Sequence, residues 1–300
     1  MTTAETEAPH PRPPERVWTV FAAYGAVWAC SCCVGAGSLV VMLISFLSKT
    51  VGLDPEDRAA LFADPASIEA IMEKEMFGSG FLASSMAAAT TCTLGLALAA
   101  AALSKVPLRE RLALGPPVWR PGYAVPAALA VMVAAPALAT TEELVAHAAM
   151  GGLSDMLQQR TDAMAVVELP WYPLTFVSTA LVAPVGEELL FRGYIQPRLV
   201  GWLGRWAGII VTSVMFGTLH LDPMHVVFAF VAGVFLGWLR ERTGSVRPSI
   251  LAHIANNTIY LAMVGFGIEL GSSWWPLAGA GALTLASIYA LTRMMVPPTP

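Results

Sequence analysis

Eight long apolar segments dominate this chain and constrain what it can fold into. They span residues 17–47, 81–103, 123–139, 172–199, 206–221, 224–239, 249–268 and 275–295. A transmembrane helix needs about 20 mainly apolar residues, because the lipid core offers the backbone no hydrogen-bond partner. Charged residues make up 13% of the chain and the mean hydropathy is +0.63, whereas a soluble domain carries about a quarter charged residues. The sequence therefore predicts an all-α, polytopic membrane protein with about eight transmembrane helices.

The segments between these helices define the predicted domain organisation. Residues 1–16 are rich in proline and glutamate and are predicted to form a disordered cytoplasmic tail, followed by a single membrane domain over 17–300. The apolar run after the tail is too long for a cleaved signal peptide, so we expect an uncleaved first helix. Residues 48–79 and 140–171 are predicted to be extracytoplasmic loops. Thr140 and Glu143 have the spacing of a capping box, which predicts a short helix in the second loop.

Lysine and arginine are distributed unevenly between the predicted loops. With the N-terminus inside, 13 of the 17 basic residues fall on the cytoplasmic side, and Lys49, Arg58, Lys74 and Arg160 fall outside. This asymmetry follows the positive-inside rule, and an even helix count then places both termini in the cytoplasm. The alanine, proline and arginine content is typical of a GC-rich bacterial genome, so we expect a bacterial inner membrane protein. The net charge of −4 and the lack of a basic surface motif indicate no nucleic-acid partner.

Three charged residues interrupt the fourth apolar segment, in the stretch "APVGEELLFRGYI". They are Glu187, Glu188 and Arg192. Each charge inside a membrane segment costs at least ~2.5 to 3.5 kcal/mol on insertion scales, which makes it a functional-site candidate. Glu188 and Arg192 are four apart and can form an ion pair on one helix face. Glu187 lies about 100° around the helix and lacks this partner, so it is hard to explain as scaffolding.

Polar residues on two later segments are predicted to approach Glu187. In "MFGTLHLDPMH", His220 lies about as far as Glu187 from the turn between the fourth and fifth helices, so antiparallel packing brings the two to a similar depth. In "LAHIANNTIY", His253 and Asn257 are four apart and share a helix face. Straight helices would separate the two histidines by roughly 15 Å. We therefore expect the turn between the fifth and sixth helices to dip into the protein interior.

These motifs together resemble those of the CAAX protease and bacteriocin-processing (CPBP) family, intramembrane glutamic endopeptidases that include the type II CAAX prenyl proteases. "GEELLFRG" resembles the EExxxR signature of that family. Phe216 and His220 in "FGTLH" resemble its second motif, an aromatic residue followed four positions later by histidine. His253 and Asn257 in "HIANN" resemble its HxxxN motif. The resemblance covers residues 170–266, which we take as the catalytic core.

The resemblance implies an endopeptidase that uses a glutamate-activated water and neither a metal nor another cofactor. In the implied mechanism Glu187 is the general base, helped by His220. His253 and Asn257 stabilise the oxyanion, while Glu188 and Arg192 support the site. One such oxyanion donor is commonly worth ~2.7 to 4 kcal/mol. The implied partners are the lipid bilayer and a protein or peptide substrate, either lipid-modified or carrying a C-terminal membrane segment. A prenylated C-terminal motif, a bacteriocin leader and a C-terminal sorting tail each suit this class.

Two other functions remain open at this stage. A non-catalytic scaffold or transporter-like protein can use the same polar cluster for binding, although a transporter typically carries such features in both halves of the chain. A zinc-dependent membrane protease can use Glu187, His220, His225 and His253, although the chain has no HExxH motif.

Other polar and sulfur-containing residues are assigned structural roles. Asp222 and Pro223 predict a turn, which we expect to include His225. The cysteines are predicted to be small packing residues rather than a disulfide or a metal site; they are Cys30, Cys32, Cys33 and Cys92.

Overall fold

The computed structural model describes residues 17–103, 106–117 and 155–266, together with positions 141, 144–145, 148–149, 151 and 289. Every regular element in this part of the chain is a helix, which confirms the predicted all-α membrane fold. The elements are α1 (Trp18–Val51), α2 (Pro55–Ala63), α3 (Pro65–Met76), α4 (Ser79–Ala102), α5 (Leu108–Arg111), α7 (Asp155–Ala165), α8 (Tyr172–Phe176), η2 (Val177–Val182), α9 (Ala183–Glu188), η3 (Leu189–Ile195), α10 (Gln196–Leu203), α11 (Arg205–Thr218), α12 (Pro223–Thr243) and α13 (Arg247–Phe266).

Four of the described helices are long and apolar enough to cross a membrane: Trp18–Val51, Ser79–Ala102, Tyr172–Leu203 and Arg247–Phe266. Helices α11 and α12 coincide with two further predicted spans but are not among these four. The predicted spans 123–139 and 275–295 lie outside the described residues, as do the tail 1–16 and the predicted cap formed by Thr140 and Glu143. The expected count of eight spans is therefore not confirmed.

The predicted loop 48–79 is mostly helical in the structure. Helix α1 continues to Val51, and α2 and α3 follow it. Asp54 accepts hydrogen bonds from the backbone N–H groups at the start of α2, and Asp64 does the same for α3. An aspartate N-cap followed by proline at the first helical position favours a helix start in both cases. The ion pair between Lys49 and Glu75 then joins the end of α1 to α3.

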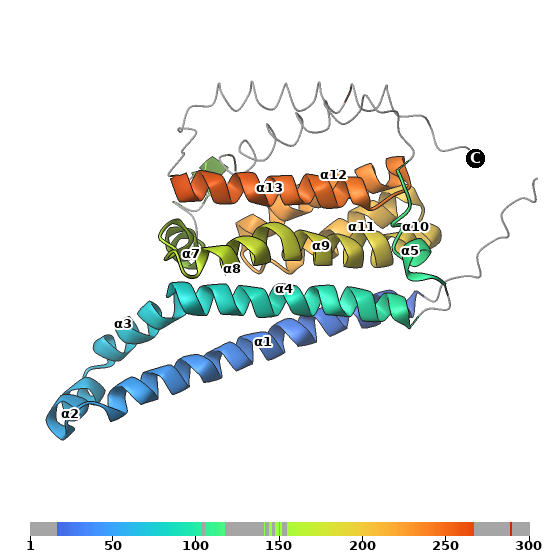
Figure 1. Cartoon of the computed structure of the whole chain (residues 1–300). Coiled ribbons are helices and arrows are strands. Elements are labelled where there is room, and N and C mark those ends of the chain that lie inside the picture. Colours follow the sequence, from blue (N-terminus) through green and yellow to red (C-terminus); the bar gives the residue numbers. More distant parts are fainter. Residues whose placement is uncertain are drawn as a thin grey trace, which may run out of the picture.

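The interrupted helix formed by α8, η2, α9, η3 and α10 lies at the centre of the bundle (Figure 1). Helix α4 packs along one side of it and is itself covered by α1. Helix α13 packs against α9 and η2, while α11 and α12 pack against each other and against α10 and η3. Helix α9, which carries Glu187 and Glu188, is thus surrounded by other helices.

Two π-helical segments flank α9 in this central helix. Segment η2 ends two residues before Pro184, and η3 ends two residues before Pro197. Proline has no N–H to donate, and its ring clashes with the carbonyl four residues earlier. We infer that the wider π turns relieve this clash at both prolines. Such turns are rare and occur frequently at functional sites.

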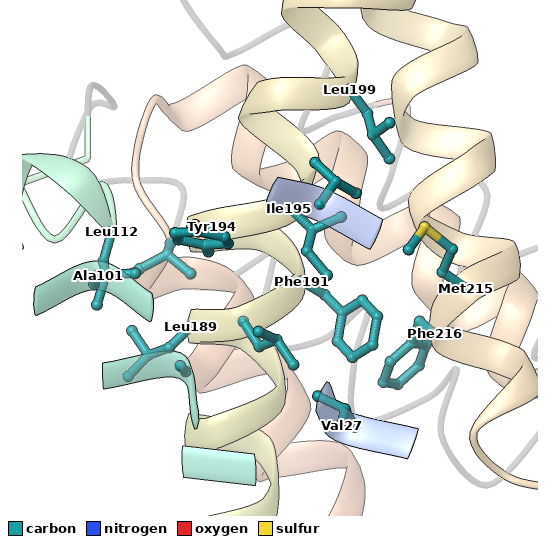
Figure 2. Packing of buried hydrophobic residues seen from close by; sticks show 14 of the residues in the cluster. Val27, Ala101, Leu112, Leu189, Phe191, Tyr194, Ile195, Leu199, Met215 and Phe216 are labelled. Atoms are coloured by element: carbon teal, nitrogen blue, oxygen red, sulfur yellow. The ribbon is translucent and has the colours of Figure 1, made fainter. Parts of the chain in front are cut away.

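The apolar core joins η3 and α10 to α11 (Figure 2). The rings of Phe191 and Phe216 meet edge to face, with centroids 5.4 Å apart. Such a pair adds ~0.5 to 1.5 kcal/mol beyond the area that it buries. In Figure 2, Val27 of α1 lies beside these two rings, and Tyr194 lies toward Leu112. This core fixes the depth of Phe216, which also contacts the polar site described below.

The cysteine prediction is wrong for one pair. Cys30 of α1 and Cys92 of α4 form a disulfide, with a sulfur–sulfur distance of 2.00 Å. The two residues are 62 positions apart in the sequence, and only the packing of α1 on α4 brings them together. Cys32 and Cys33 are free and exposed.

Because α10 and α11 approach closely, replacing each of two glycines by alanine should have opposite effects on stability. A Cβ atom at Gly208 would lie 2.5 Å from the backbone nitrogen of Val200, whereas one at Gly201 would meet nothing within 4 Å. We expect Gly208→Ala to lower the free energy of unfolding by about 1 to 3 kcal/mol, because backbone must shift. Gly201→Ala should raise it by up to about 1 kcal/mol, since alanine is the better helix former. Denaturant unfolding of both variants in mixed micelles tests this, and equal effects would contradict it.

Candidate active site

Two adjacent glutamates of α9 meet one histidine of α13. The Nδ1 atom of His253 lies 3.0 Å from Glu188 Oε1, and its Nε2 atom lies 3.8 Å from Glu187 Oε2. The imidazole ring therefore lies between the two carboxylates. The contact between α9 and α13 joins residues that are 65 positions apart in the sequence.

Glu188 and Arg192 form the ion pair that their spacing predicts. Arg192 Nη1 donates to Glu188 Oε1 at 2.8 Å, and both side chains are completely buried. The Nη2 atom donates to the carbonyl of Gly233 in α12 at 3.1 Å, and the guanidinium lies 4.5 Å from the centre of the Phe216 ring. A Cβ atom at Gly233 would lie 3.2 Å from Nη2, so this glycine permits the close approach. One arginine thus connects η3 to α11 and α12.

The ion pair also orients the ring of His253. Glu188 Oε1 accepts from Arg192 and lies within hydrogen-bond distance of His253 Nδ1. Because Oε1 already accepts from Arg192, a bond to the same oxygen from His253 is one in which Nδ1 donates. The ring is held with Nε2 on the side of Glu187.

Exposure separates the two glutamates. The side chain of Glu188 is completely buried, whereas that of Glu187 is 23% exposed. Of the two side chains, only that of Glu187 is partly exposed. Glu188 is committed to contacts within the protein.

His220 lies at the end of α11, beside the same aromatic ring as His253. The centroid of Phe216 is 5.1 Å from that of His220 and 5.9 Å from that of His253, edge to face in both cases. The two histidines therefore surround one phenyl ring instead of lying at opposite ends of straight helices. Helix α11 ends at Thr218 and α12 begins at Pro223, so four residues form the turn. Leu221 in this turn adopts a left-handed conformation with φ of 64°.

His225 belongs to the predicted turn, and it also contacts His220. Asp222 accepts a hydrogen bond from the backbone N–H of His225, which caps the start of α12. The imidazole rings of His220 and His225 lie 4.8 Å apart. The sequence analysis placed His225 in the turn and, under the zinc alternative, among the possible ligands, but did not predict its contact with His220. The sequence feature that could have predicted the contact between His220 and His225 is their position on either side of an Asp-Pro turn.

Asn257 faces the central helix from the same side of α13 as His253. Its Nδ2 atom donates to the carbonyl of Thr179 in η2 at 2.9 Å. Asn256 donates to Asn257 Oδ1 at 3.2 Å. The predicted residues of α9, α11 and α13 therefore lie around one region of the bundle, with Asn257 one helical turn beyond His253.

Metal binding has no visible donor cluster in the described ranges. Within 17–103, 106–117 and 155–266, no three His, Cys, Asp or Glu residues are arranged to hold a metal ion. The stretch "EELVAH" also combines two adjacent glutamates with a histidine, as a metal or catalytic site does. These residues, Glu142, Glu143 and His147, lie outside the described residues.

Comparisons with known proteins match the segment that contains this site. Residues 169–259 match the family model described as "Type II CAAX prenyl endopeptidase Rce1-like". Over 91 residues the chain is 30% identical to "Putative membrane peptidase YdiL" of Bacillus subtilis (strain 168), an alignment that covers 30% of this chain and 37% of YdiL. No solved structure matches significantly. The resemblance to the CAAX protease family is thereby confirmed over this segment, and both matches support a membrane protease.

The buried ion pair predicts an asymmetric effect of mutation on stability. Arg192→Met leaves the buried carboxylate of Glu188 without its cation, and we expect a loss of about 3 to 5 kcal/mol in the free energy of unfolding. The double variant Glu188→Met, Arg192→Met removes both charges and should lose less. Unfolding in mixed micelles measures both. A double variant less stable than Arg192→Met would show that the uncompensated charge is not the cause.

Proposed function

We propose that this protein is an intramembrane endopeptidase that hydrolyses a peptide bond by means of a water activated by Glu187, without a metal. The observation that carries the proposal is the different exposure of the two glutamates. The Glu187 side chain is partly exposed, whereas that of its neighbour Glu188 is fully buried and paired with Arg192. The family-model match over residues 169–259 and the similarity to YdiL support the same class of reaction.

In the proposed reaction Glu187 takes a proton from water, and the water oxygen attacks the carbonyl carbon of the scissile bond. A carboxylate positioned as a general base commonly contributes ~10²- to 10⁴-fold. The proton then passes from Glu187 to the leaving nitrogen as the carbon–nitrogen bond breaks. His220, whose ring packs against that of Phe216 in the same region, assists the transfer.

The developing oxyanion is stabilised by donors on α13. His253 is held by Glu188 through Nδ1, and its Nε2 beside Glu187 donates to the oxyanion only when the ring carries a proton on both nitrogens. Asn257 uses its Nδ2 to bind the carbonyl of Thr179, and an amide nitrogen carries a second hydrogen that can point to substrate. Donors fixed before the reaction are effective because they need no reorganisation when the charge develops.

The proposed substrate is a protein or peptide whose cleaved bond lies near a membrane-embedded or lipid-linked segment. The name of the matching family model refers to prenylated CAAX substrates, whereas that of YdiL specifies only a membrane peptidase. The alignment spans only 37% of YdiL, so that similarity does not define a substrate for the whole chain. The proposed substrate class is based instead on the position of the site within the membrane helices. We further propose a location in a bacterial inner membrane with both termini in the cytoplasm, on the basis of the arginine distribution.

Cleavage assays on the purified protein test this proposal. The substrates are a farnesylated peptide, its unmodified form, a leader peptide and a protein with a C-terminal membrane segment, each assayed with a strong zinc chelator present. We expect chelator-resistant cleavage of at least one substrate. Glu187→Gln and His220→Ala should each lower kcat by ~10²-fold or more, because both remove proton transfer.

Glu69→Gln is the matched control, since it removes one exposed carboxylate outside the site. It should cleave at the wild-type rate, and all variants should unfold at the wild-type midpoint. Full activity of Glu187→Gln would reject the assigned base. Loss of activity in chelator, restored by zinc, would instead establish a metalloprotease.

A further inference from the structure

A second polar region lies at the end of the bundle away from α2 and α3. The segment 106–117, the start of α10 and the end of α12 line a half-open cavity of about 580 Å³ there. Its charged lining contains four arginines and one glutamate: Arg109, Arg111, Arg198, Arg240 and Glu110. None of these residues belongs to the site around Glu187.

The walls of this cavity are held in place by hydrogen bonds and packing. The backbone N–H of Val246 donates to the carbonyl of Ala113 at 3.0 Å, and the Ser245 hydroxyl donates to the carbonyl of Gly115 at 2.7 Å. Leu112 is completely buried within the apolar core, close to Gly193 of η3. The segment 106–117 is therefore attached both to the turn between α12 and α13 and to the central helix.

Two of the arginines are ordered on the cavity wall. Arg198 is only 7% exposed; its guanidinium donates to the carbonyl of Tyr194 and lies 3.6 Å from the centre of that residue's ring. Arg240 pairs with Glu241, and its Nε atom is buried without a hydrogen-bond partner among the described residues. Glu241 also accepts a hydrogen bond from Gln196 Nε2 at 3.0 Å, so Arg240 is not the only partner of this carboxylate.

Among the described residues, arginines are the main charged groups of the lining. Four of them line the cavity with one carboxylate, that of Glu110, and Glu241 pairs with Arg240 beside it. Orientation in the membrane requires only that basic residues be near a helix end, and exposed arginines such as Arg205 already satisfy this. This requirement does not account for the buried Nε atom of Arg240, which has no hydrogen-bond partner among the described residues.

We propose that this cavity is a binding site for a phosphate group, carried either by an anionic phospholipid headgroup or by a soluble phosphate. Guanidinium groups match phosphate oxygens with paired, charge-assisted hydrogen bonds. Basic pockets between membrane helices on the cytoplasmic side commonly bind lipid phosphates. This inference is independent of the proposed peptidase activity, and its test uses no cleavage.

Binding to the full-length protein in a neutral detergent tests the site. The probes are short-chain phosphatidylglycerol, a diacylglycerol with the same acyl chains and inorganic phosphate, followed by native mass spectrometry and by the midpoint of thermal unfolding. We expect saturable binding of phosphatidylglycerol and none of diacylglycerol. Arg109→Gln and Arg240→Gln should each weaken it at least about tenfold, because a hydrogen bond to a charged group is worth ~1.5 to 3 kcal/mol.

Arg205→Gln is the matched control, since it removes an exposed arginine from the start of α11 that does not line the cavity. Its affinity should stay within about twofold of the wild type, as a surface charge contributes little. Inorganic phosphate that displaces the lipid would support a soluble ligand, and failure to displace it would support the lipid. Equal binding of diacylglycerol, or equal losses in Arg205→Gln and Arg109→Gln, would overturn the proposal. If Arg240→Gln does not fold, the exposed Arg109 decides the outcome.

Discussion

The buried ion pair between Glu188 and Arg192 is the interaction on which the rest of this site depends. Both side chains are completely shielded, so each requires the other to offset the cost of its burial. The pair does more than neutralise charge. Glu188 holds His253 of α13, while Arg192 binds the carbonyl of Gly233 in α12 and covers the ring of Phe216 in α11. Three helices are positioned around the central one through two side chains.

This arrangement explains why two glutamates follow one another in the sequence. Glu188 faces the protein interior and supplies the fixed charge that orients His253. Glu187, about 100° around the helix, is partly exposed beside the opposite nitrogen of the same ring. One carboxylate is committed to contacts within the protein, and the other belongs to a partly exposed side chain. Both glutamates lie in α9, between the two π-helical segments.

One turn along the central helix, the same packing pattern recurs. Gln196 follows Arg192 by four residues, and its amide donates to the carbonyl of Gly237, which follows Gly233 by four. A Cβ atom at Gly237 would lie 2.6 Å from Gln196 Oε1, so glycine again permits the close contact. Through Glu241 and Arg240 this row of polar groups reaches the arginine-lined cavity. The two polar regions of the protein are therefore parts of one packed interface between the central helix and α12.

The sequence by itself determined the helical class, the Glu188–Arg192 pair and the residues of the three motifs, because hydropathy and helical spacing are local properties of the chain. It did not determine the contacts between segments. The disulfide between Cys30 and Cys92, the helices within 48–79 and the contact of His225 with His220 were all assigned otherwise or missed. The same is true of the cavity wall formed by 106–117. Only the tertiary structure decided them, since each depends on how helices distant in sequence pack together, and in particular on how the 219–222 turn brings His220 and His253 to one phenyl ring.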